Sequence, residues 1–129
     1  MRYNIKFNDN IPNGVEMQSD FEVLNVFFHS FSTEQLVDLM LCLMNNEGYI
    51  GDPKGLILYH ELDAEDIATG NIFEQNEIKV YHHYFGEKTL RKNLFIKILT
   101  DYLKKVKEKN TNIKFNDTLK KFMLFLHTY

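Results

Sequence analysis

The sequence has one cysteine, no long apolar run and few basic residues in its first two thirds. Because Cys42 is alone among the 129 residues, no disulfide can form within the chain, and we expect a buried thiol at this position. No stretch approaches the roughly 18 apolar residues that cross a bilayer, and the start of the chain lacks the apolar core of a signal peptide. These absences predict a cytoplasmic protein with no membrane partner.

The patterns that usually mark catalysis or nucleotide binding are missing too. The glycine-rich stretch 48–55 has neither the Gly-Lys-Ser/Thr ending of a phosphate loop nor a Gly-x-Gly-x-x-Gly pattern. No Ser/His/Asp or Cys/His set indicates a nucleophile, and the chain contains no internal repeat or low-complexity tract. We expect a protein that is not an enzyme and that needs no cofactor.

What is present is the composition of an ordinary globular protein. Apolar residues make up 44% of the chain and charged residues 26%. A chain of this length falls in the usual range for one domain and can bury roughly two thirds of its unfolded surface. We therefore predict a single domain over residues 1–129.

The charges are strongly segregated along the chain. Residues 1–86 contain 14 Asp and Glu but 4 Lys and Arg, whereas residues 87–129 contain 4 Asp and Glu and 11 Lys and Arg. Such an asymmetry indicates a charged partner.

Hydrophobic periodicity predicts the elements of the first half. Residues 2–7 alternate as in a half-buried strand, and residues 8–14 have the composition of a loop. Two helices follow, one over 19–31 begun by Ser19 and one from Ser32 to near Gly48, each with capping-box spacing at its start.

The second half is predicted to contain two strands and two helices. Strands over 56–62 and 72–85, joined by turn residues at 69–71, would form an antiparallel hairpin. A long helix is expected after Gly86, and a last helix is expected to be capped by Asn116 or Asp117. The apolar stripe of the long helix begins at Leu90 and repeats at Leu94, Ile98, Tyr102 and Val106. The fold class that follows is α+β, with a small antiparallel sheet and about four helices.

An acidic cluster lies on the predicted hairpin and its connection. Such a field can raise the rate of encounter with a cationic partner about 10-fold or more, although a solvated loop would have the same composition. A metal site is not expected, because the run from Asp63 to Asp66 lacks the spacing of a calcium loop. The carboxylates are Asp52, Glu61, Asp63, Glu65, Asp66, Glu74 and Glu77.

Two alternatives come from the remaining polar residues. His60 could approach His82 or His83 across the hairpin and form a zinc or acid-base site, although two histidines alone do not define one. The basic face of the long helix could bind phosphates of a nucleic acid, although such a face also keeps a helix soluble. Its residues are Lys88, Arg91, Lys92, Lys104 and Lys105.

The order of elements resembles the immunity proteins of bacterial contact-dependent growth inhibition systems, those paired with ribonuclease toxins. The resemblance covers roughly residues 20–127 and depends on three features. They are the segment 56–62 with its acidic continuation 63–66, the segment 71–80, and the long helix around 94–103.

This resemblance implies a cytoplasmic, non-enzymatic partner that binds the C-terminal domain of a cognate toxin and blocks its active site or substrate surface. An acidic face suits a ribonuclease, whose cleft must hold a polyanion. Affinity would come from aromatic anchors beside the carboxylates, with Tyr49, Tyr59, Phe73 and Tyr81 as candidates and a core position as the alternative for Tyr59 and Tyr81. The predicted partner-binding residues are Asp52, Tyr59, Glu61, Asp63, Glu65, Asp66, Phe73, Glu74 and Glu77.

Overall fold

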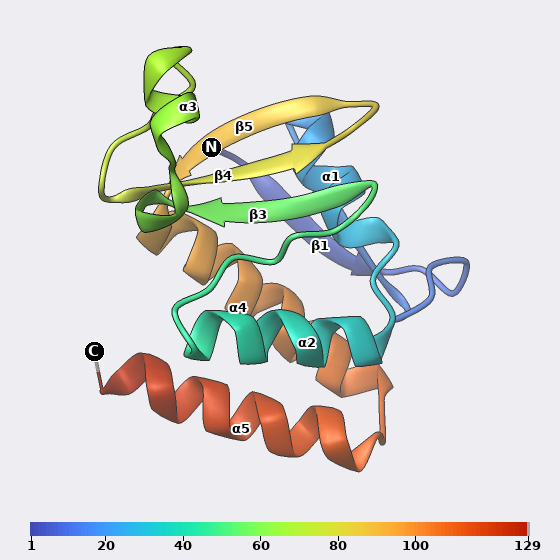
Figure 1. Cartoon of the computed structure of the whole chain (residues 1–129). Coiled ribbons are helices and arrows are strands. Elements are labelled where there is room, and N and C mark those ends of the chain that lie inside the picture. Colours follow the sequence, from blue (N-terminus) through green and yellow to red (C-terminus); the bar gives the residue numbers. More distant parts are fainter. Residues whose placement is uncertain (129) are drawn as a thin grey trace.

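The computed structural model describes residues 1–128 and shows an α+β fold with two small antiparallel sheets (Figure 1). The two-stranded sheet pairs β1 with β2, and the three-stranded sheet has the order β3-β4-β5. The strands are β1 (Tyr3–Phe7), β2 (Val15–Ser19), β3 (Lys54–Leu58), β4 (Glu77–His82) and β5 (Gly86–Arg91). The helices are α1 (Glu22–His29), α2 (Thr33–Met44), α3 (Ala64–Ala68), α4 (Lys92–Lys109) and α5 (Ile113–His127), with a short 3₁₀ turn η1 (Tyr59–Glu61) after β3.

The N-terminal hairpin is only half anticipated by the sequence. The strand predicted over 2–7 is confirmed as β1, but its partner β2 was missed. In β2, Val15 and Met17 are buried in the core. The alternate positions of this short strand are only Val15, Met17 and Ser19, which are too few to show a period of two clearly. Ser19 therefore ends β2, and the prediction that it caps the first helix is wrong, since Phe21 occupies the N-cap of α1.

The helix start predicted at Ser32 is confirmed. The Ser32 hydroxyl accepts a hydrogen bond from the Gln35 backbone N–H at 3.2 Å, and the Gln35 side chain accepts one from the Ser32 N–H at 2.9 Å. This reciprocal pair satisfies two of the donors that every helix start leaves free. α2 then packs along α5 below the sheets (Figure 1).

The predicted antiparallel pairing of the second half is confirmed, with corrected boundaries. β3 pairs with β4 from Lys54 opposite His82 to Leu58 opposite Ile78, so both strands are shorter than expected. Residues 69–71 do not form a tight hairpin turn, because the connection contains η1 and α3. The chain leaves the sheet at Leu58 and returns to it at Glu77.

The helix predicted directly after Gly86 begins only at Lys92, five residues later than expected, because β5 precedes it. Leu90, which fits the helical spacing, lies on β5 opposite Ile78 and faces the core from there. The last helix begins at Ile113 with Asn112 as its N-cap, so the expected caps at 116 or 117 are wrong. The Asn112 side chain accepts the Phe115 N–H at 2.9 Å.

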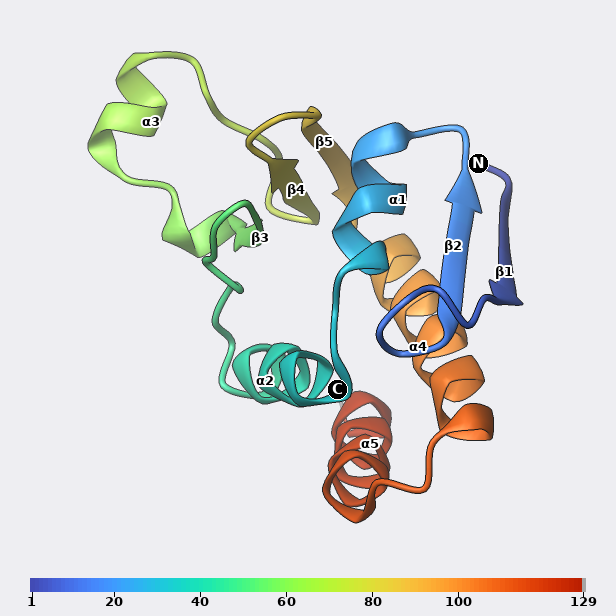
Figure 2. The same ribbon diagram turned by 90° about the vertical axis from the view of Figure 1, so that its right-hand side faces the viewer.

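The core lies between the two sheets, where α1 is enclosed and α4 crosses beneath both (Figure 2). Tyr102 of α4 is fully buried, and its hydroxyl lies 2.7 Å from the Val15 carbonyl oxygen and 3.1 Å from that of Phe28. Burial raises the pKa of Tyr102 well above its usual value. One side chain thus joins β2, α1 and α4. On the face of the three-stranded sheet that points away from α1, no helix of residues 1–128 packs across the strands (Figure 2).

Candidate functional site

The three-stranded sheet has one face turned to the core and one turned outward. Leu56, Val80 and Leu90 are buried on the inner side, so alternation along the strands places Ile57, Lys79 and Thr89 in one row on the outer side. The segment 59–76, which we call the acidic segment, rises beside this outer face, and its helix α3 stands away from the sheet (Figure 2). The outer face is therefore a broad surface bordered by the acidic segment.

The acidic run that begins α3 is held by a reciprocal capping box. The Asp63 carboxylate accepts the Asp66 N–H at 2.9 Å, and the Asp66 carboxylate accepts the Asp63 N–H at 3.1 Å. These hydrogen bonds, above all the one from the Asp66 N–H, lower the pKa of Asp63. Both carboxylates therefore cap the start of this short helix in addition to carrying charge.

Glu61 and Glu77 also satisfy backbone groups. The Glu61 carboxylate accepts the Leu58 N–H at 2.8 Å and the Gly48 N–H at 3.0 Å, and so fixes the end of β3 against the segment after α2. Glu77 accepts the Glu74 N–H at 2.8 Å. These two predicted partner-binding residues therefore hold the ends of the segment in place.

A groove of about 660 Å³ lies between α3, its flanking segments and the sheet, and we call it the α3 groove. The ring of Tyr59 packs edge-to-face on Phe73, with 6.4 Å between the ring centres. Phe73 is 8% exposed and forms the base of this pair, whereas Tyr59 is 44% exposed and is not a core residue. The groove is lined by Tyr59, Ile67, Ile72, Phe73, Glu74 and Glu77, among others.

Ile67 and Ile72 are functional candidates that sequence reasoning missed. They are 63% and 58% exposed, although isoleucine is usually buried in a folded protein. The signal that could have found them is an isolated apolar residue inside a polar, acidic stretch. Together with Tyr59 they give the α3 groove an apolar surface that water covers in the free protein.

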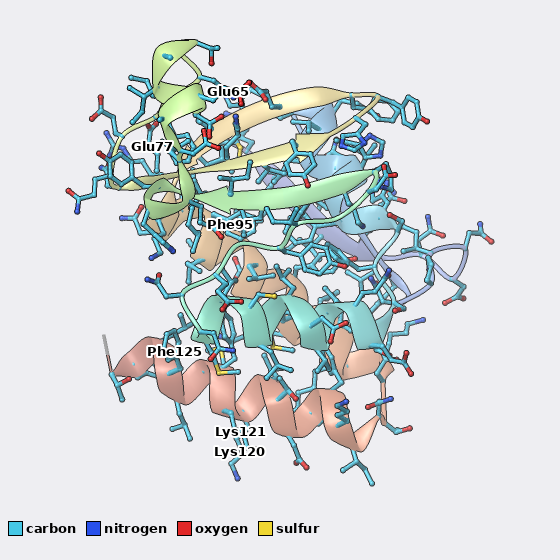
Figure 3. The ribbon with its side chains drawn as sticks, viewed as in Figure 1. Glu65, Glu77, Phe95, Lys120, Lys121 and Phe125 are labelled. Atoms are coloured by element: carbon cyan, nitrogen blue, oxygen red, sulfur yellow. The ribbon has the colours of Figure 1, made fainter. Side chains whose placement is uncertain are left out.

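The charges around the groove are carboxylates. Glu65 and Glu74 are exposed, and neither makes an ion pair among the described residues. Figure 3 shows Glu65 and Glu77 beside α3, at the opposite end of the molecule from Lys120 and Lys121 on α5. The separation is not complete, because exposed Arg91 lies opposite Glu77 across the β4–β5 pair and the Lys92 N–H donates to the Asn76 carbonyl at 2.8 Å.

Asp52 does not belong with the other acidic residues. It precedes β3, whereas the acidic segment follows it, so the length of the strand separates them. Its carboxylate lies 2.8 Å from Nδ1 of His83. The predicted cluster of seven carboxylates is therefore six at one end of the sheet and one at the other.

The histidines do not converge. His60 follows the C-terminal end of β3, while His82 pairs with Lys54 at the N-terminal end of that strand. Burial, followed by the positive charge of Lys54, lowers the pKa of His82. Among residues 1–128, no three His, Cys, Asp or Glu side chains are arranged to hold a metal ion.

The other aromatic candidates have structural partners. Tyr49 packs on Phe31 with 5.5 Å between the ring centres, at the margin of the core. The Tyr81 hydroxyl donates to the Gly51 carbonyl at 2.8 Å and accepts the Gly51 N–H at 3.2 Å. Both residues fix the segment that leads into β3.

Cys42 is half-buried, and burial raises the pKa of its thiol.

Part of the basic face of β5 and α4 is occupied by contacts within the chain. The ammonium group of Lys88 lies 4.1 Å from the centre of the Phe21 ring. That of Lys105 lies 4.3 Å from the Phe7 ring centre and 3.7 Å from the Glu108 carboxylate. The exposed members of the set are Arg91, Lys92 and Lys104.

Comparisons with protein-family models, with curated proteins and with solved structures found no match for this chain. No helix within residues 1–128 combines the length and the apolar character needed to span a membrane.

Proposed function

We propose that this chain is an immunity protein that binds the C-terminal domain of a cognate toxin, a basic ribonuclease, and covers its active site or substrate surface. The observation that carries the proposal is the α3 groove, in which exposed Tyr59, Ile67 and Ile72 lie among exposed carboxylates. Apolar side chains exposed together, with a charged rim, are typical of a surface that binds another protein.

The electrostatics support a basic partner. Glu65 and Glu74 carry charges that no ion pair neutralises among the described residues, and the nearby Lys79 is 5% exposed. The Lys79 ammonium donates to the Asn71 side chain at 2.8 Å and lies 3.5 Å from the Glu87 carboxylate. Exposed Arg91 and Lys92 lie at one end of the segment, beside Glu77, whereas the exposed charges of Glu65 and Glu74 are negative and would speed the encounter with a cationic cleft.

The shape of the site fits inhibition by coverage. The groove is open, and its charged groups stand on a segment that projects beyond the sheet (Figure 1). An enzyme site of the kind weighed from the sequence needs His60 beside His82 or His83, and these residues lie at opposite ends of β3. The groove offers contact area and charge, which are what an inhibitor requires.

Co-purification tests the proposal. The tagged chain is expressed together with the C-terminal domain of the protein encoded immediately upstream of its gene, and growth of the cells is followed. We expect a stable complex and rescued growth. Separate elution of the two proteins without rescue contradicts the proposal, and RNA retained on the tagged chain would favour binding of nucleic acid through Arg91, Lys92 and Lys104 instead.

A further inference from the structure

The turn between β4 and β5 exposes two large aromatic side chains. Tyr84 is 84% exposed and Phe85 is 50% exposed. We call Tyr84 and Phe85 the aromatic tip. Aromatic residues are enriched where proteins bind one another, and nothing in the packing of the core accounts for rings held in water at this turn.

The turn is held by hydrogen bonds among its own residues. The Phe85 N–H donates to the His82 carbonyl at 3.2 Å, and the Tyr84 N–H lies 3.1 Å from Nδ1 of His82. Gly86 closes the turn with φ of +93°, the left-handed conformation that ends a three-residue hairpin connection. The His82 ring packs on Phe85 with 4.9 Å between the ring centres.

Further contacts tie the turn to the segment before β3. The His83 N–H donates to the Pro53 carbonyl at 2.8 Å, and the His83 side chain lies 2.8 Å from the Asp52 carboxylate. The His83 ring stacks on the ring of Tyr81. The Tyr81 hydroxyl in turn accepts a hydrogen bond from the Gly51 N–H and donates one to the Gly51 carbonyl. Because these contacts hold the backbone of the turn, a partner that binds the tip orders mainly side chains.

Two carboxylates near the turn are more exposed than the basic groups they pair with, Asp52 at 2.8 Å from His83 and Glu87 at 3.5 Å from Lys79. The side chains of Asp52 and Glu87 are 84% and 57% exposed, whereas Lys54 and Lys79 are each 5% exposed. The region of the tip therefore offers exposed aromatic rings and exposed carboxylate oxygens, which are the two kinds of group that a nucleic-acid cleft binds as bases and phosphates. A cleft that stacks bases and pairs with phosphates can therefore accept such a tip.

We infer that the aromatic tip is a second contact with the basic partner and that Tyr84 is the anchor that enters its nucleic-acid cleft. The inference rests on the proposed function and deepens it. A shallow hollow of about 440 Å³ lies beside the tip on the outer face, lined by Ile57, Tyr81 and Glu87 among others. The outer face therefore has one depression at each end.

The spacing of the two depressions suits one interface. β4 runs between them, and its six residues extend about 20 Å at roughly 3.4 Å per residue. A protein interface of standard size covers about 800 Å² on each partner, which is enough to include both ends of such a strand. One partner can therefore contact the α3 groove and the aromatic tip together.

The test compares Tyr84→Ala, Tyr84→Phe and the wild-type chain in binding to the same upstream-encoded C-terminal domain, with association and dissociation rates measured separately. Leu124→Ala is the matched control, because Leu124 is 61% exposed on α5, away from the sheet. Thermal unfolding of every variant shows that the fold is kept. We expect Tyr84→Ala to weaken binding about 30-fold or more, mainly by faster dissociation.

Tyr84→Phe should stay within about 3-fold of the wild type, because the ring is retained. If Tyr84→Ala binds like the wild type while charge reversal at Glu65 and Glu74 slows association, the inference on the tip is wrong and the proposed function stands. If the wild-type chain does not bind the domain at all, both are wrong.

Discussion

The ammonium nitrogen of Lys54 lies 3.5 Å from the centre of the Phe31 ring, and it also donates to the Phe27 carbonyl at 2.6 Å and the Ser30 hydroxyl at 2.7 Å. The side chain thus links the start of β3 to the C-terminal end of α1, where carbonyl groups lack helical partners. Its surroundings are a ring and neutral oxygens, and burial lowers the pKa of Lys54 to about 7.

This lowered pKa predicts a pH dependence of stability. Between pH 7 and about 10.5 the unfolded chain holds a proton on Lys54 that the folded chain has released, so the free energy of unfolding rises with pH. The slope should approach ~1.4 kcal/mol per pH unit. Urea unfolding at pH 7, 8 and 9 measures it.

The matched variant is Lys54→Met, which has no titrating group at this position. The difference in unfolding free energy between the wild type and the variant should change across the same pH steps in favour of the wild type. A difference that stays constant from pH 7 to pH 9 would show that Lys54 remains protonated in the folded protein, held by its ring and carbonyl contacts.

Glu61→Ala should destabilise the fold. The substitution leaves the N–H groups of Gly48 and Leu58 without their acceptor, and an unsatisfied buried donor costs about 1–3 kcal/mol. Glu65→Ala is the control, since Glu65 is exposed, and should change the unfolding free energy by less than about 0.5 kcal/mol. Chemical denaturation of both variants at pH 7 makes the comparison. Equal stability of the two would contradict a structural role for Glu61.

If the proposed function is correct, charge reversal at Glu65 and Glu74 should slow association with the proposed toxin domain. Asp63 and Asp66 are less suitable targets, because their carboxylates cap α3 and their replacement would disturb the segment as well as its charge. The double variant Glu65→Lys/Glu74→Lys should associate about 10-fold more slowly at low salt, and the difference should shrink as salt screens the field. Stopped-flow or surface-binding kinetics at two ionic strengths provide the measurement, and an unchanged rate at low salt rules out steering by these residues.

Gly55→Ala should be one of the most damaging single substitutions on the sheet. A Cβ atom at Gly55 would lie within 2.5 Å of the Tyr49 carbonyl oxygen, a backbone atom, and would also overlap the Tyr81 side chain. We expect a loss of about 2–3 kcal/mol, as for overpacked core positions. Thermal or urea unfolding tests this. Gly70→Ala is the contrasting case, because no atom lies within 4 Å of a Cβ there and only its φ of +76° is strained.

Local patterns predicted the elements that depend on local contacts. The start of α2 could be predicted because Ser32 and Gln35 form their capping box with each other. β5 could not be predicted from its pattern, because Leu90 fits the spacing of the apolar residues of α4. Residues 86–91 are extended because they pair with β4. Pairing with a neighbouring strand decides such a segment, and a periodicity within the segment itself does not show that pairing.

The candidate site likewise has one part that could be predicted from the sequence and one part that could not. The sequence identified the acidic residues and Tyr59 and Phe73 because charge and ring type are visible without a fold. It could not show that Glu61 bonds backbone groups on two segments, nor that Asp52 lies at the opposite end of β3 from the rest. These facts depend on where the chain leaves and rejoins the sheet.

The segment 59–76 has a consequence for how such a protein can diversify. Its ends are set by the pairing of Leu58 with Ile78, and its interior is organised by hydrogen bonds among its own residues, such as those of Asp63 with Asp66. Exposed positions such as Ile67 and Ile72 can therefore vary while the register of the sheet stays the same. A lineage of such proteins could acquire new partners by changing this one insertion on a conserved framework, much as binding loops vary on a fixed scaffold.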